Sequence, residues 1–166
     1  MFVSIEQFIQ AWQNESKATE RVMDLLNDQA LSQAITPESR TLGQIAWHIA
    51  TSIHEMLSRT GLEFPAPEGE EMAPQSAQFI AQTYRDSSSA IIQVIKNQWT
   101  DEHLAQLCDM YGEQWPNGLT LHILIQHEIH HRGQMTVLMR QAGLRVPSIY
   151  GPTREDWLQQ GMSPLL

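Results

Sequence analysis

Four long segments of this 166-residue chain carry apolar residues at every third or fourth position, which is the spacing of one face of an α-helix. The chain has few β-branched runs and no convincing strand between these segments. Helices with an apolar face must bury that face against one another. The pattern therefore predicts an all-α protein, built as a four-helix bundle.

The first two predicted helices open at capping-box sequences, in which a Ser or Thr is followed three residues later by Gln. The first helix opens at Ser4, weakens around Asn27 and stops by Pro37. The second opens at Thr41 and runs to about Arg59. A polar loop with two prolines follows, and such a loop does not form a strand in a packed sheet.

The other two predicted helices have different boundary signals. The third begins near Pro74, because proline suits the first turn of a helix, and it ends around Trp99. The fourth runs from about Leu119 to Ala142, and Gly143 directly after it is a stop signal.

The connections complete the predicted architecture. Between the third and fourth helices we expect a short helix over residues 100–107 and a loop over residues 111–118. This link is long enough to cross over the bundle. The short C-terminal tail carries one or two helical turns over residues 154–159, with Trp157 anchoring it to the body. We expect a single domain, residues 1–166, with a long crossover connection.

The charge balance limits the partners. The formal net charge is -9, and the Lys and Arg residues do not form a cluster. Nucleic acids and anionic membranes are bound through such clusters, so neither partner is expected. Cys108 is the only cysteine, which excludes an intrachain disulfide and a cysteine-based structural zinc site. The start lacks a secretory signal and no segment is long and apolar enough for a membrane span, so we expect a cytoplasmic protein.

Two histidines four residues apart dominate the fourth predicted helix. In the stretch QHEIHHRGQM, His127 and His131 lie about 40° apart on the helix and share a stripe with leucines, so we expect them to face the core. His130 lies on the flank of this stripe, and His122 points roughly the opposite way, so we expect His122 to be solvated. Two inward imidazoles can be ordinary core residues with hydrogen-bond partners, but a divalent cation satisfies both at once, and we favour the metal.

The second predicted helix supplies the best third ligand. His48 sits in the apolar stretch LGQIAWHIA, whereas His54 falls about 120° away from it. Taken alone, His48 reads as a core histidine. Together with His127 and His131 it completes a three-histidine site, which leaves a dication with its full charge and an open coordination position, as in catalytic metal sites.

The same stretch also matches H-E-x-x-H, the zinc-protease motif, with Glu128 as general base. Neither extended form of that motif follows His131, and Glu155 lies in a tail bounded by proline and glycine. No edge strand is expected that would hold a peptide substrate. The protease reading is therefore disfavoured.

Four polar residues beside the three histidines each have two possible roles. Gln44, Ser52, Glu55 and Gln134 either orient the imidazoles or simply lie on helix surfaces, and the surface reading is favoured for Ser52 and Gln134. Glu55 is the best-placed candidate for a general base. Arg132 is expected to be solvated or paired with an acid.

The segments LGQIAWHIA and HEIHHRGQM, with VPSIYGPTREDW near the end, resemble the DinB/YfiT-like superfamily of metal-binding four-helix bundles over essentially the whole chain. In that family, one histidine of helix two and both histidines of an H-x-x-x-H-[RK]-G-Q motif in helix four bind a divalent metal. The matching residues here are His48, His127 and His131. By this match Glu128 and His130 occupy variable positions, so neither inherits a role.

The resemblance also bears on function. Characterised relatives include bacillithiol S-transferases and a mycothiol-dependent maleylpyruvate isomerase, and family members often form homodimers. The resemblance therefore implies one divalent metal (zinc, nickel or another first-row transition metal), a low-molecular-weight thiol as co-substrate, a small-molecule electrophile and a homodimer.

Three functional hypotheses remain open from the sequence. The first is a metal-dependent transferase that adds a small thiol to an electrophile. The second is a metal-dependent hydrolase, and the third is a non-catalytic metal-binding protein linked to stress. A fourth metal ligand supplied by a protein side chain would favour the third.

Overall fold

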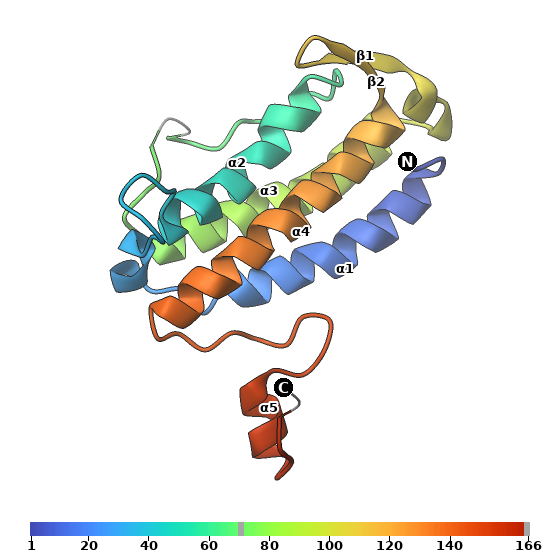
Figure 1. Ribbon diagram of the computed structural model, residues 1–166. Coiled ribbons are helices and arrows are strands. Elements are labelled where there is room, and N and C mark those ends of the chain that lie inside the picture. Colours follow the sequence, from blue (N-terminus) through green and yellow to red (C-terminus); the bar gives the residue numbers. More distant parts are fainter. Residues whose placement is uncertain (70–71, 165–166) are drawn as a thin grey trace.

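A computed structural model describes residues 1–69 and 72–164 of the chain, and it confirms the all-α four-helix bundle. The four long helices pack side by side (Figure 1). Their bounds are α1, Ile5–Met23; α2, Leu42–Ser58; α3, Ala77–Gln98; and α4, Asn117–Gln141. The shorter elements are the 3-10 helices Asp28–Ser32 and Asp101–Ala105, strands β1 (Leu107–Met110) and β2 (Glu113–Pro116), and helix α5 (Arg154–Gln159).

The helix starts agree with the sequence to within a few residues, but only one of the two expected capping boxes forms. The Thr41 hydroxyl accepts the Gln44 backbone N–H, and the Gln44 side chain accepts the Thr41 backbone N–H. Ser4 precedes α1 without any side-chain capping bond. Helix α3 begins after Ser76, whose hydroxyl caps Phe79, and not at the proline two residues earlier. A hydroxyl acceptor satisfies a free N–H at the helix start, which proline cannot do.

The crossover connection lies between α2 and α3. The sequence had suggested the connection between α3 and α4, because that connection is long. Figure 1 shows α2 and α3 running in the same direction, so the chain returns along the length of the bundle between the end of α2 and the start of α3. Helices α3 and α4 run in opposite directions and are joined at one end of the bundle.

The predicted loop over residues 111–118 is wrong, because most of it belongs to a β-hairpin. Strands β1 and β2 pair in antiparallel register, with Cys108 opposite Trp115. Tyr111 and Gly112 both have positive φ, at 58° and 88°, which is the backbone of a tight two-residue hairpin turn. Each strand has four residues and only β1 alternates between exposed and buried positions, so the sequence pattern was too weak to indicate strands.

The core lies between all four long helices. Its largest fully buried apolar side chains include Phe8 and Trp12 of α1, and the Trp12 indole N–H donates to the Ser88 carbonyl of α3 at 3.0 Å. The chain start packs on the beginning of α4, where the Phe2 N–H donates to the Gly118 carbonyl at 3.0 Å. A Cβ at position 118 would lie 2.2 Å from the Phe2 carbonyl oxygen, so this close approach requires glycine.

The C-terminal tail contacts the bundle differently from the prediction. Helix α5 forms over Arg154–Gln159 as expected, but it stands away from the bundle and none of its residues is buried, Trp157 included. Ion pairs from Arg140 to Glu155 and from Arg145 to Asp156 connect it to the end of α4 and the segment after it. No helix in the described part of the chain is long and apolar enough to cross a membrane.

Candidate metal centre

The structure brings His48, His127 and His131 together between α2 and α4. The Nε2 atoms of His48 and His127 are 3.0 Å apart, and one ligand atom from each of the three rings lies within 4.8 Å of the others. The ring centroids are 4.4–4.8 Å apart. Helix α4 contributes two imidazoles because its residues four apart share a face, and α2 places the third opposite them.

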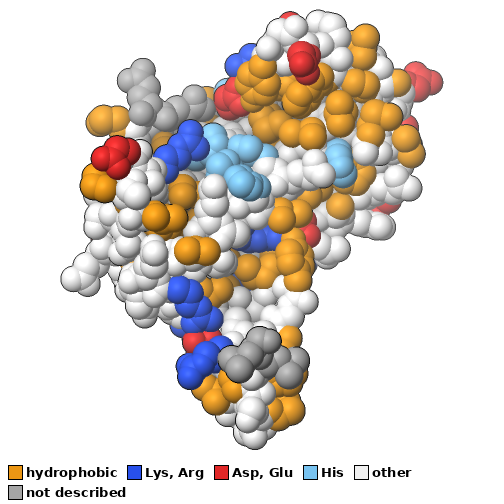
Figure 2. Space-filling model, viewed as in Figure 1, with side chains coloured by type: hydrophobic (Ala, Val, Ile, Leu, Met, Phe, Trp, Pro, Cys, Tyr) orange, Lys and Arg blue, Asp and Glu red, His pale blue; other side chains and the backbone are white. Residues whose placement is uncertain are grey.

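The expected orientation of α4 needs correction. His127 and His131 are half-buried at a groove, and not in the core. The inward face of α4 instead carries Glu128 and Arg132, each 1% exposed, together with leucines and methionines. Figure 2 shows a patch of His side chains on the surface of the bundle, with a Lys or Arg side chain directly against it. Solvent and small ligands therefore have access to the three rings.

The three imidazoles are held in their neutral form. Burial lowers the pKa of His48 to about 4, helped by the positive charge of Arg40 and by His131. Burial also lowers the pKa of His127 to about 4, with smaller contributions from the other two rings. The pKa of His131 is lowered mainly by burial, against a hydrogen bond from Gln134 that raises it. Neutral imidazole is the form that binds a metal. Near neutral pH these three rings can therefore bind a metal without first losing a proton.

The polar neighbours differ in how they contact the rings. Gln134 Oε1 lies 2.7 Å from His131 Nδ1, which fixes the proton on Nδ1 and leaves Nε2 as the free donor atom. Ser52 lies 3.4 Å from His48 Nδ1, and its hydroxyl donates to the His48 carbonyl at 2.5 Å. The surface interpretation was therefore wrong for Ser52, which is 4% exposed. Gln134 is exposed on the helix surface as expected, and it also contacts the His131 ring. Gln44 serves the helix cap instead.

The donor set fits a divalent transition metal. Tetrahedral coordination with metal–nitrogen bonds of about 2.1 Å places ligand nitrogens roughly 3.4 Å apart, and the separations here bracket that value. A shared cation would satisfy the Nε2 atoms of both His48 and His127, which lie 3.0 Å apart. No other His, Cys, Asp or Glu of the described residues joins the cluster, so these residues supply three metal ligands.

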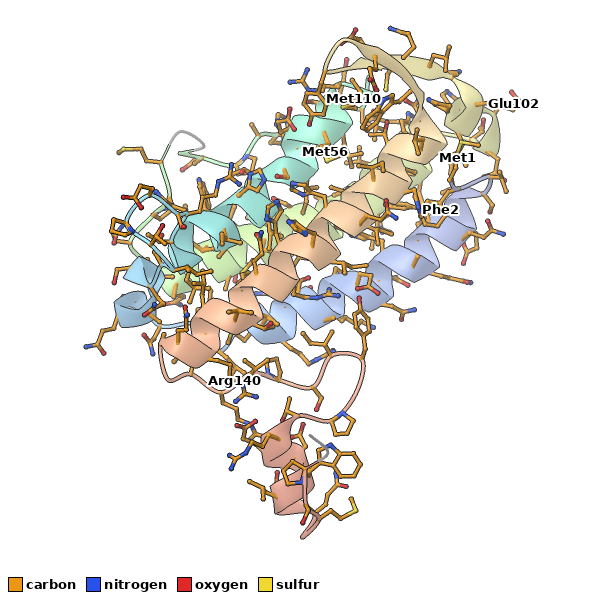
Figure 3. All side chains as sticks on the ribbon, in the orientation of Figure 1. Met1, Phe2, Met56, Glu102, Met110 and Arg140 are labelled. Atoms are coloured by element: carbon orange, nitrogen blue, oxygen red, sulfur yellow. The ribbon has the colours of Figure 1, made fainter. Side chains whose placement is uncertain are left out.

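Glu55, the expected general base, is already engaged. Its Oε1 pairs with Arg59 at 2.8 Å, and its Oε2 accepts the Tyr111 hydroxyl at 2.7 Å. The Tyr111 contact connects the hairpin to α2. Figure 3 labels Met110 of the hairpin and Met56 of α2 at this end of the bundle. Glu55 therefore has a structural role in this arrangement.

The remaining histidines of the described chain stay outside the cluster. His130 is exposed, with Nε2 3.2 Å from the Gln134 amide, as its flanking position predicted. His122 is half-buried with its ring edge against Phe2, so it is less solvated than expected. His54 packs against Phe64, and His103 stacks on Trp99.

A buried polar network behind the centre was missed from the sequence. Glu128 Oε1 accepts the hydroxyls of Thr19 and Tyr84 at 2.7 and 2.8 Å. Burial raises the pKa of Glu128 to about 7, against the opposing hydrogen bonds and the nearby Arg132. Arg132 was expected to be either solvated or paired with an acid. It pairs with Glu15 of α1, and this ion pair is largely buried. The only sequence signal was the four-residue spacing of Glu128 and Arg132.

Two hollows flank the three histidines. The larger, of about 580 Å³, has His48 and Trp47 in its wall and lies at the start of α2. The smaller, of about 390 Å³, has His131 and Gln134 in its wall. Arg40 lines both. The histidine centre is therefore next to space of the size that small ligands occupy.

Comparison with known proteins identifies the family of the chain. The sequence model of the DinB family matches residues 1–162. The chain belongs to the DinB family.

Individual relatives agree with this family assignment. The chain is 48% identical over 162 residues to YrdA of Bacillus subtilis, covering 98% of this chain and 97% of that protein, which is described as uncharacterized. Among solved structures, a DinB-like protein from Bacillus cereus is 46% identical, with a TM-score of 0.87 over 90% of this chain and all of the other. YjoA of Bacillus subtilis, at 21% identity and a TM-score of 0.68 over 86% of this chain and 97% of the other, shares the fold. The DinB resemblance in the sequence is thereby confirmed.

Proposed function

We propose that this DinB-family protein is a metal-dependent enzyme that transfers a low-molecular-weight thiol to a small electrophile. His48, His127 and His131 would hold one divalent first-row transition metal. Zinc, nickel and other metals of this group all accept imidazole ligands, so the donor set is consistent with several of them.

The observation that carries the proposal is a three-imidazole cluster that is open to ligand-sized space. Structural metal sites are closed by four protein ligands, whereas catalytic sites keep a position for substrate. Here the described residues offer three neutral nitrogens and no fourth side chain. This arrangement favours an enzyme over a protein that only stores or senses metal.

A metal held in this way lowers the pKa of a bound thiol, so that a strong nucleophile exists at neutral pH. The chain's own residues would set the geometry. Gln134 contacts Nδ1 of His131 and Ser52 contacts Nδ1 of His48, which leaves Nε2 of each ring free to bind the metal. The hollows on either side leave room for the thiol and for the electrophile.

The first test is metal content. Purified protein is expected to contain about one divalent metal per chain, measured by elemental analysis, and the metal is expected to fall sharply in His127→Ala. His130→Ala is the matched control, since His130 lies on the same helix outside the cluster, and it should keep its metal. Unchanged metal in His127→Ala would overturn the site.

The second test is the reaction. The metal-loaded protein is assayed for conjugation of bacillithiol, mycothiol, glutathione and coenzyme A to an electrophilic dye, with His127→Ala as the inactive reference. Turnover with at least one thiol is expected. Cleavage of an ester or amide without any conjugation would replace the transferase by the hydrolase. No turnover in either assay would leave a metal-binding protein.

A further inference from the structure

Arg40 occupies a special position beside the histidine centre. It lies two residues before Leu42, the first residue of α2, and it lines both hollows that flank the three histidines. His48 lies in the wall of the first hollow and His131 in the wall of the second. The Arg40 charge also contributes to the lowered pKa of both rings. A ligand that reached the centre from either side would therefore meet this guanidinium.

Arg40 differs from the other arginines of the bundle because it has no partner among the described residues. Ion pairs engage the following arginines: Arg59, Arg85, Arg132, Arg140 and Arg145. Arg21 donates to backbone carbonyls. Arg154 has no such bond to the described chain either, but it lies on α5, away from the bundle. An exposed cation next to a ligand-sized hollow, in a chain of net charge -9, is free to bind an anion.

The surroundings of Arg40 reinforce its positive potential. The larger hollow is formed in part by Thr41, Gly43 and Gln44 at the start of α2, where the helix dipole favours negative charge. The first turn of α2 contains no acidic residue to meet that charge. Among the described residues that line the two hollows, none carries a carboxylate. Within residues 1–69 and 72–164, no carboxylate in the walls of these hollows balances the charge of Arg40.

Trp47 adds a second, independent observation in the larger hollow. It is 4% exposed and lines the wall next to His48, yet its indole N–H has no acceptor among the described residues. A buried donor without an acceptor is costly. The wall of the larger hollow therefore contains the unpaired Arg40 cation, and next to it a residue whose shielded indole N–H no described residue satisfies.

We propose that the centre takes a ligand that carries a carboxylate, and that Arg40 binds this carboxylate while the ligand's other end reaches the three histidines. The proposal rests on the proposed function, because it assumes a metal at those histidines. A carboxylate is favoured over a phosphate because one planar guanidinium matches two carboxylate oxygens, and no second cation lines the hollows in the described chain. Arg40 is thus a specificity-determining residue for substrate or thiol.

The test compares a thiol that carries a carboxylate with one that carries a hydroxyl. Because the carboxylate can also bind cobalt directly, the comparison with Arg40→Ala decides whether Arg40 causes the preference. Protein loaded with cobalt(II) is titrated with mercaptoacetate and with 2-mercaptoethanol, and the thiolate-to-cobalt absorption band reports binding. We expect mercaptoacetate to bind the wild-type protein about tenfold more tightly, as one charge-assisted pair allows. Arg40→Ala should lose this preference, and Arg154→Ala, the other unpaired arginine, should keep it. Cobalt content is measured after each titration, and it should be equal in all three proteins.

The outcomes separate this inference from the proposed function. Equal binding of the two thiols by the wild type, or a preference that survives in Arg40→Ala, would overturn the role of Arg40 while leaving the metal site intact. If neither thiol gives a band, the thiol chemistry fails, and acetate is titrated against the cobalt d–d spectrum instead. Acetate binding that is lost in Arg40→Ala would still support the carboxylate site. No such binding, or tighter binding of inorganic phosphate, would overturn it.

Discussion

Replacing Arg132 with alanine tests the buried network that lies directly behind the histidine centre. The Arg132 side chain is 1% exposed and donates four hydrogen bonds. Two go to the carbonyl and carboxylate of Glu15, one to the Thr19 hydroxyl and one to the Tyr150 hydroxyl. The guanidinium is also 4.0 Å from Glu128. The substitution leaves these acids without their cation in a largely dry place.

The expected loss of stability follows from this burial. Removing one partner of a buried ion pair costs about 3–5 kcal/mol, because the remaining charge is uncompensated. Whole domains are stable by only about 5–15 kcal/mol, so Arg132→Ala should remain folded but be strongly weakened. Arg145→Ala is the matched control. Arg145 also pairs with an acid, but its side chain is 56% exposed, so its loss should cost less than about 1 kcal/mol.

The assay is urea unfolding of the metal-free proteins, followed by tryptophan fluorescence. A lower midpoint with an unchanged slope reports lost stability and not a changed unfolded state. Metal content of the folded Arg132→Ala protein should stay near one per chain, because Arg132 points into the bundle and not to the groove. A cost within about 1 kcal/mol of the Arg145→Ala control would refute the argument that this network is a buried charge cluster.

Three further predictions concern single contacts. His127→Ala should lose most of the bound metal by elemental analysis, since only two imidazoles of the cluster remain. Gly118→Ala should lower the unfolding free energy by about 1–3 kcal/mol because its Cβ would clash with the Phe2 carbonyl, whereas Gly133→Ala, with nothing within 4 Å, should be neutral or stabilising in the same urea experiment. Thr41→Ala should cost about 1 kcal/mol by removing a helix cap; Ser4→Ala, which removes no capping bond, should cost much less, and equal costs would contradict the capping argument.

Much of the fold follows from local sequence signals. The four long helices, the cap at Thr41 and the small helix at residues 154–159 were all expected, because 3.6-residue periodicity and capping residues act over a few neighbouring positions. The hairpin was not expected, because two strands of four residues each are stabilised by pairing with each other and by the contact of Tyr111 with Glu55 of α2. Neither contact is visible in the local sequence. The position of the crossover also depends on which helices pack together, which no local signal specifies.

The candidate site likewise depends partly on local sequence signals and partly on tertiary packing. The sequence by itself determined that His127 and His131 share one face of α4 and that His48 lies on a second helix, because helical spacing fixes angles between residues of one helix. It did not determine how α4 is rotated in the bundle, since apolar residues occur around much of that helix. Only packing against the other three helices turned Glu128 and Arg132 inward and left the histidines at a groove. Tertiary structure likewise decided that Arg40, unremarkable in the sequence, stands beside them.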